Sequence, residues 1–142
     1  AETERRCVSA LATTQDPSGN TLELYWGRQL DYAPLASPTG VSGFVTSFQG
    51  TGDLGFGHAV LPAPDFAATT AFYTDIIGTG MTDVLSIPGM EGVKIHFMHA
   101  NNPRQHSLAL FSGPHPLGIV HLMVEVQTMD EVSPWSTATT AC

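Results

Sequence analysis

The sequence predicts an α+β fold built around one unit in which a strand is followed by a helix and three more strands. Three observations predict it. One segment, 66–77, has clear helical spacing, an apolar strand pattern precedes it at 56–61, and three strand patterns follow it between 81 and 112. The 142 residues are enough for one domain that buries a sizeable core.

The expected helix has recognisable signals at both ends. Asp65 is a residue type that caps helix N-termini, and Gly78 is the type that ends helices in the left-handed conformation. Between them Phe66, Tyr73 and Ile77 recur at helical spacing. The sequence therefore predicts one helix over 66–77.

Strand patterns lie on both sides of this helix. A hairpin is predicted near the N-terminus, because Asp16-Pro17-Ser18-Gly19-Asn20 is a strong turn signal. After the helix, Pro- or Gly-containing separators divide the remaining patterns. The predicted strands are 7–13, 21–26, 56–61, 81–87, 93–99, 106–112 and 118–124.

The region between the hairpin and the helical unit has no clean period. Residues 28–54 are rich in Gly, Pro and Ser, and we interpret them as a linker between two structural units. The predicted organisation is a hairpin unit at 1–27, the linker 28–54, the main unit at 55–132 and a polar tail at 133–142. A second helix is conceivable at 127–132, but Pro134 would interrupt it.

Two predicted strands each carry one histidine in the middle. By alternation His58 shares a face with Phe56 and Val60, and His121 shares a face with Met123. A histidine in a strand is commonly a hydrogen-bonded core residue, so each one alone indicates little. Two in corresponding strands leave two interpretations open, core residues or a shared metal site.

Composition excludes several classes of function. Thirteen acidic and five basic residues give a net charge of −8, which argues against binding to nucleic acid. No apolar run approaches the roughly 20 residues of a membrane span, and residues 1–6 lack the apolar core of a signal peptide. Cys7 and Cys142 suggest no disulfide framework. A cytoplasmic protein is therefore expected.

Five short motifs between 55 and 132 resemble a known family. They are Gly-His-Ala-Val, Ala-Phe-Tyr-Thr-Asp, His-Phe-Met-His, His-Ser-Leu-Ala-Leu and Val-His-Leu-Met-Val-Glu-Val. In this order and spacing they resemble the type I extradiol ring-cleaving dioxygenases of the vicinal oxygen chelate superfamily. The resemblance implies a fold of paired βαβββ modules. Residues 55–132 would form one complete module plus the first strand of the next, and 1–27 the terminal hairpin of a preceding module.

The same resemblance implies the chemistry and its residues. It implies extradiol cleavage of a catechol such as 2,3-dihydroxybiphenyl by O2 at a mononuclear Fe(II), with His58 and His121 as ligands. Open positions beside the protein ligands suit Fe(II) for binding both substrates. His106 would assist proton transfer, and alternation places it on the face of Leu108 and Leu110. The positions that match the catechol pocket are Phe97, Val60 and Ala109.

One ligand of the family has no counterpart at its usual place. The family takes a carboxylate from the last strand of the module that begins at His121, and this strand is absent. The pattern Pro17-x-Gly19 followed by Glu23 resembles the way the fold presents that carboxylate. Glu23 would serve as the third ligand if the hairpin 7–26 paired with 118–126, within one chain or across a dimer.

Other expectations concern partners and competing functions. A lone module leaves a strand edge and an apolar face without partners, so a homo-oligomer is expected. A metal- or small-molecule-binding module of the same fold without turnover is the main alternative to an enzyme. A glyoxalase-like metal isomerase on the same scaffold is a third.

Overall fold

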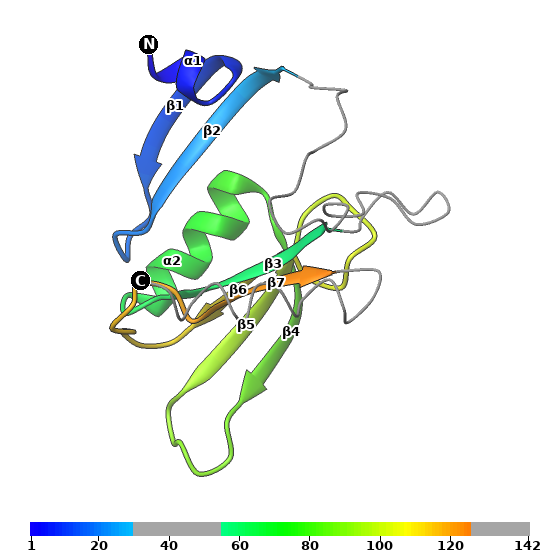
Figure 1. Ribbon diagram of the computed structural model, residues 1–142. Coiled ribbons are helices and arrows are strands. Elements are labelled where there is room, and N and C mark those ends of the chain that lie inside the picture. The colour runs from blue at the N-terminus through cyan, green and yellow to red at the C-terminus, as the bar shows by residue number, and fades with distance from the viewer. Residues whose placement is uncertain (30–54, 126–142) are drawn as a thin grey trace, which may run out of the picture.

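The computed structural model describes residues 1–29 and 55–125. In these ranges a two-stranded sheet and a five-stranded sheet are arranged on either side of one long helix (Figure 1). The predicted linker, the possible helix at 127–132 and the tail at 133–142 lie outside the described residues, apart from positions 28 and 29. The observed elements are α1 Glu2–Arg5, β1 Val8–Gln15, β2 Thr21–Arg28, β3 Gly55–Pro62, α2 Phe66–Ala71, η1 Phe72–Ile77, β4 Gly80–Ser86, β5 Lys94–His99, β6 Leu108–Phe111 and β7 His121–Glu125.

The larger sheet has the strand order β4-β5-β6-β3-β7. Strands β3 and β6 are parallel, and the other neighbouring pairs are antiparallel. The helix crosses over between β3 and the strands that follow it, which gives the predicted βαβββ order. The α+β expectation is confirmed.

The helix forms because its ends are capped and one side is apolar. Asp65 accepts a hydrogen bond from Ala68 N at 3.4 Å, and Gly78 ends the helix with φ of 85°. The second half, η1, is a π-helical continuation of α2, so the predicted span 66–77 is confirmed. Its buried face packs on the sheet, in a core of Ala63, Tyr73, Met98 and Leu110.

The hairpin docks on this helix through its turn. Ser18 Oγ lies 2.6 Å from Thr69 Oγ1, and Asn20 Nδ2 donates to the carbonyl of Pro62 at 3.0 Å. The buried Asp16 accepts a hydrogen bond from Tyr73 OH at 3.2 Å. In Figure 1 the turn accordingly points toward the helix, and the rest of the hairpin extends away from the larger sheet.

The predicted pairing of the hairpin with 118–126 is wrong within one chain. In the described residues β1 and β2 pair only with each other, and β7 pairs only with β3. The physical reason is the turn: its contacts with Pro62 and Thr69 fix the hairpin on the helix side of the molecule.

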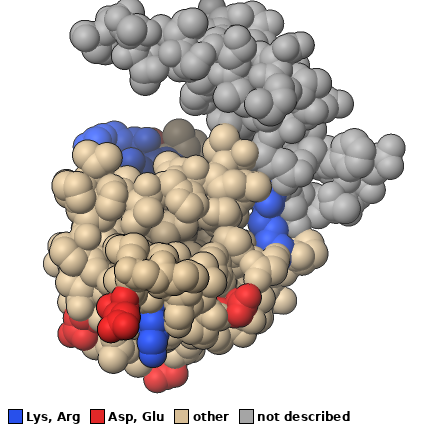
Figure 2. All heavy atoms as spheres, turned by 90° about the horizontal axis from the view of Figure 1, so that it is seen from below, with Lys and Arg blue, Asp and Glu red and all other residues tan. Residues whose placement is uncertain are grey.

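Two further features concern helix length and the distribution of surface charge. The described residues contain no helix that is long and apolar enough to cross a membrane. On the face seen in Figure 2, most atoms belong to uncharged residues, with acidic and basic side chains scattered among them. This distribution agrees with the low charged content of 13%.

Candidate metal centre

The candidate site lies on the face of the larger sheet that α2 does not cover. Residues directly opposite each other in neighbouring strands project to the same face. The register pairs Val60 with Ala109, Phe97 with Ala109, and Val60 with His121. Five predicted site residues therefore share one face: His58, Val60, Phe97, Ala109 and His121.

His58 and His121 meet at their ring nitrogens. The two Nε2 atoms lie 3.0 Å apart, and the rings are nearly perpendicular, with 67° between their planes. Of the two interpretations that the sequence left open, buried core residues do not fit, because His121 is exposed and His58 is half-buried. The strands β3 and β7 thus aim both imidazoles at one point.

A β-bulge at Gly57 shapes this face. The register of β3 with β7 shifts between Phe56 and His58, so that Phe56 faces Val124 and His58 faces Met123. Phe56 therefore projects to the opposite face from His58, and the expected sharing of a face is wrong. A Cβ at Gly57 would lie 2.0 Å from Met123 Sδ, so only glycine leaves room for this side chain.

His106 lies in the loop before β6, and its ring contacts the ring of His58. Its ring centroid lies 4.2 Å from that of His58 and 4.9 Å from that of Phe97. The expectation that it shares the face of Leu108 and Leu110 is wrong, since both leucines belong to or pack against the helix-side core. Strand β6 begins only at Leu108, so alternation does not extend back to His106.

Burial and neighbouring charges lower the pKa of two of these rings, those of His58 and His106. Burial lowers the pKa of His58, and the neighbouring His106, His121 and Arg104 lower it further. Burial followed by the charge of His121 lowers the pKa of His106. Neutral imidazoles are the form that binds metals and accepts protons.

The histidine pair fits a metal ion. Two ligand atoms about 2.1 Å from an ion, at right angles, are about 3.0 Å apart, which is the observed separation of the Nε2 atoms. The described residues contain no group of three or more His, Cys, Asp or Glu that could hold a metal. The described residues therefore offer two candidate ligands, His58 and His121.

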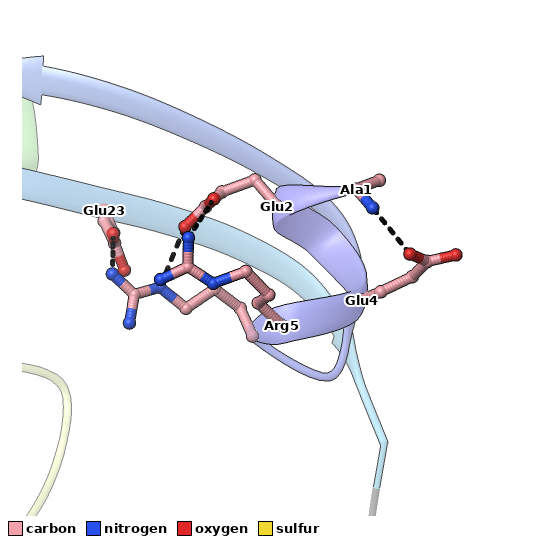
Figure 3. Close-up of polar contacts among 6 residues, drawn as sticks. Ala1, Glu2, Glu4, Arg5 and Glu23 are labelled. Atoms are coloured by element: carbon pink, nitrogen blue, oxygen red, sulfur yellow. Dashed lines mark hydrogen bonds and ion pairs between the residues drawn. The ribbon is translucent and has the colours of Figure 1, made fainter.

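The structure does not bring Glu23 to this pair. Its carboxylate lies 2.5 Å from Arg6 Nη2, beside the N-terminal helix α1 (Figure 3). Arg6 also approaches Glu2 at 3.7 Å, so Glu23 belongs to a surface ion-pair network. The other histidines lie elsewhere: His96 bonds to Thr70 on the helix side, and His99 bonds to Thr82.

Comparison with known families agrees with the geometry. Residues 55–140 match the family described as Glyoxalase/Bleomycin resistance protein/Dioxygenase superfamily. The chain belongs to this superfamily. The match begins at the first residue of β3 and includes the strands of His58 and His121.

Within the superfamily the chain is similar to extradiol dioxygenases. It is 40% identical to an iron-dependent extradiol dioxygenase of Rhodococcus jostii strain RHA1, over 89% of this chain and 43% of that protein. It is also 40% identical to a biphenyl-2,3-diol 1,2-dioxygenase of Pseudomonas sp. strain KKS102, over 91% of this chain and 43% of the relative. The chain thus spans less than half the length of these relatives.

A solved structure gives the same result. The 2,2',3-trihydroxybiphenyl 1,2-dioxygenase of Sphingomonas wittichii strain RW1 superposes with a TM-score of 0.70 at 30% identity. The superposition covers 98% of this chain and 46% of that enzyme. This coverage includes the hairpin as well as the larger sheet.

Sequence reasoning missed three residues near the site. Met123 occupies the space beside Gly57, Arg104 contributes to the low pKa of His58, and Gln105 bonds to the ring of His106. The glycine before His58 was the available signal for a bulge. Arg104 and Gln105 lie in a loop, where no periodic pattern predicts which way a side chain projects.

Proposed function

We propose that this chain carries the iron-binding face of an extradiol dioxygenase, which cleaves a catechol such as 2,3-dihydroxybiphenyl with O2. The observation that carries the proposal is the 3.0 Å separation of His58 Nε2 and His121 Nε2. The similarity to extradiol dioxygenases supports it.

His58 and His121 would hold Fe(II), which when bound supplies adjacent positions for the catechol oxygens and O2. Two neutral imidazoles leave the charge of the ion uncompensated, so a carboxylate is needed for full binding. In this proposal it comes from outside the described residues, in the same or another chain.

The remaining residues would serve the catechol itself. Val60 and Ala109 are buried and apolar, and Phe97 presents a ring beside His106. A substrate ring that lies on this surface displaces water, which strengthens the electrostatic interactions of its two oxygens. His106 would accept a proton from the substrate and return it as the ring opens. Both atoms of O2 enter the product, so no external reductant is required.

One observation favours a second candidate function. With two metal-binding side chains in the described residues, a binding module without turnover remains consistent with the geometry. We also infer that the chain self-associates, because part of its apolar surface has no cover in the described residues.

The decisive experiment loads the purified chain with Fe(II) without oxygen, then measures bound iron and the yellow product after a catechol and O2 are added. His58→Ala should lose iron and ring cleavage. His96→Gln, on the other face of the same sheet, is the matched histidine control and should keep both. Iron binding without product in the wild type would favour the binding module, and no iron binding would contradict both iron-dependent cleavage and a metal-binding module.

Glu23→Ala completes the set. If Glu23 belongs only to the Arg6 network, this variant keeps the iron content of the wild type. Loss of iron in Glu23→Ala as well as His58→Ala would instead indicate a ligand supplied across a dimer.

A further inference from the structure

The position of His106 requires a cause other than strand pairing. Pairing extends to Ser107, whose backbone N–H donates to Met98 O at 2.9 Å, and Leu108 then faces the helix-side core. The ring of His106 nevertheless lies against His58 and Phe97 on the opposite face. Something must hold the segment just before Ser107 in this conformation.

Thr82 contacts that segment from β4. The register of β4 with β5 shifts between Met81 and Asp83, so Thr82 is the additional residue of a bulge. Its Oγ1 lies 2.7 Å from Gln105 O and 2.8 Å from His99 Nδ1. Bulges re-aim side chains next to active sites, and this one directs a hydroxyl at the neighbour of His106.

The chemistry of the three groups fixes the direction of both hydrogen bonds. A carbonyl oxygen only accepts, so the single proton of the Thr82 hydroxyl is donated to Gln105 O. Thr82 Oγ1 must then accept from His99 Nδ1–H. One hydroxyl thereby ties β4 and β5 to the backbone of Gln105.

Gln105 connects this restrained backbone to the ring of His106. Its side-chain Oε1 is hydrogen-bonded to His106 Nδ1. Because an amide oxygen accepts, Nδ1 carries the proton and donates, which leaves Nε2 of the neutral ring as a proton acceptor. The loop is stiffened further by Asn102, which accepts from Arg104 N at 3.1 Å and donates to Ser107 Oγ at 3.0 Å.

We propose that Thr82 is a positioning residue, which acts through Gln105 to fix the orientation and the tautomer of the His106 ring. The use of His106 in proton transfer rests on the proposed function. The positioning itself is a property of the metal-free chain and is testable without iron or substrate.

The first test is nuclear magnetic resonance of the metal-free protein labelled with nitrogen-15. Ring nitrogen shifts report the tautomer, and nuclear Overhauser effects between His106 and Phe97 report the ring position. Thr82→Val removes the hydroxyl at nearly constant volume, and should weaken these effects and lose the preference for the Nδ1–H tautomer. Thr82→Ser retains the hydroxyl and should restore both.

Two further variants separate positioning from general stability. Thr74→Val removes a hydroxyl that bonds to helix carbonyls at 3.2 Å, and should leave the signals of His106 unchanged. Gln105→Met tests the second link at an exposed residue, so it remains informative if Thr82→Val does not fold. Wild-type tautomer and contacts in Thr82→Val, or in Gln105→Met, would overturn the proposal.

The second test applies if the iron-loaded chain cleaves catechols. Thr82→Val should lower kcat by about fivefold to tenfold, the effect of one lost hydrogen bond, with KM and iron affinity unchanged. An equal loss of iron affinity would assign Thr82 a merely structural role and overturn the proposal. A wild type that binds no iron contradicts the proposed function, while the first test still decides the role of Thr82.

Discussion

At the scale of single residues, the site depends on small departures from regular strand geometry. Gly57 adds a residue to β3, and Phe56 is turned away from the histidine face as a result. The φ angle of Gly57 is not in the left-handed region. Glycine is therefore needed at this position for space beside Met123 rather than for backbone freedom. The bulge at Thr82 has a similar effect on the loop that carries His106.

The residue scale also gives a prediction for pH. Burial lowers the pKa of His96, and the charge of Lys94 lowers it further, while the ring packs 4.3 Å from Phe66. Below its ordinary pKa of about 6.5 the unfolded chain binds a proton that the folded chain does not. The free energy of unfolding should therefore fall as the pH is lowered from about 7 to about 5.

His96→Gln should reduce this dependence on pH, because one of the groups responsible is removed. His58 and His106, whose pKa values are also lowered, contribute to the dependence in the same direction. Urea unfolding of both proteins across this range is the measurement. Above about pH 7 the difference between them should be constant, which serves as the control. Parallel curves at all pH values would contradict the prediction.

At the scale of elements, the hairpin and the helix are joined by a buried carboxylate. Asp16 accepts from Ser18 N and Asn20 N at 2.9 Å each, from Asn20 Nδ2 at 2.8 Å and from Tyr73 OH at 3.2 Å. Burial, and then the adjacent carboxylate, raise the pKa of Tyr73 above its usual range, so the phenol remains a donor. These hydrogen bonds thereby fix the hairpin turn to Tyr73, a core residue of the helix.

Asp16→Ala should lower the free energy of unfolding by about 2–3 kcal/mol, because it leaves buried donors without acceptors. Urea denaturation provides the measurement. Asp75→Ala is a suitable control, since this exposed side chain accepts a hydrogen bond from its neighbour Thr74, and its loss should change stability by less than about 0.5 kcal/mol. Equal effects of the two substitutions would show that the network does not hold the hairpin.

At the scale of the whole molecule, apolar side chains remain exposed at the β3–β7 end of the larger sheet. Phe56, Leu122 and Val124 share the face opposite the histidines and are 59%, 57% and 47% exposed. In the described residues β7 also pairs on one side only. Such an edge with an apolar face favours association.

We expect the purified chain to form dimers or larger oligomers in a concentration-dependent way. Leu122→Ser with Val124→Thr should shift the equilibrium to the monomer, because it removes apolar area from this face. Ile76→Ser is the control, since Ile76 is 72% exposed on the helix and lies outside the patch. Analytical ultracentrifugation over a range of concentrations measures the effect. A wild type that stays monomeric at the highest concentration would be evidence against this prediction.

The sequence by itself located the long helix and the strands, although not the short helix α1, and it singled out the candidate site residues. Helical spacing with Asp65 and Gly78 at the ends located the helix, and period-2 patterns with turn residues located the strands. The motifs around His58 and His121 identified the family. These features are local, because each depends on residues that are close together along the chain. The sequence of such a segment is therefore enough to predict its secondary structure.

Only the tertiary structure decided how the pieces meet. Alternation predicted the wrong face for Phe56 and for His106, because a bulge adds one residue and a loop follows no period. The tertiary structure also decided that Glu23 pairs with Arg6 and that the hairpin docks on the helix through Asp16. These outcomes depend on contacts between residues that are far apart in the chain. Such residues come together only when the chain folds, so local sequence patterns do not indicate which of them will pair.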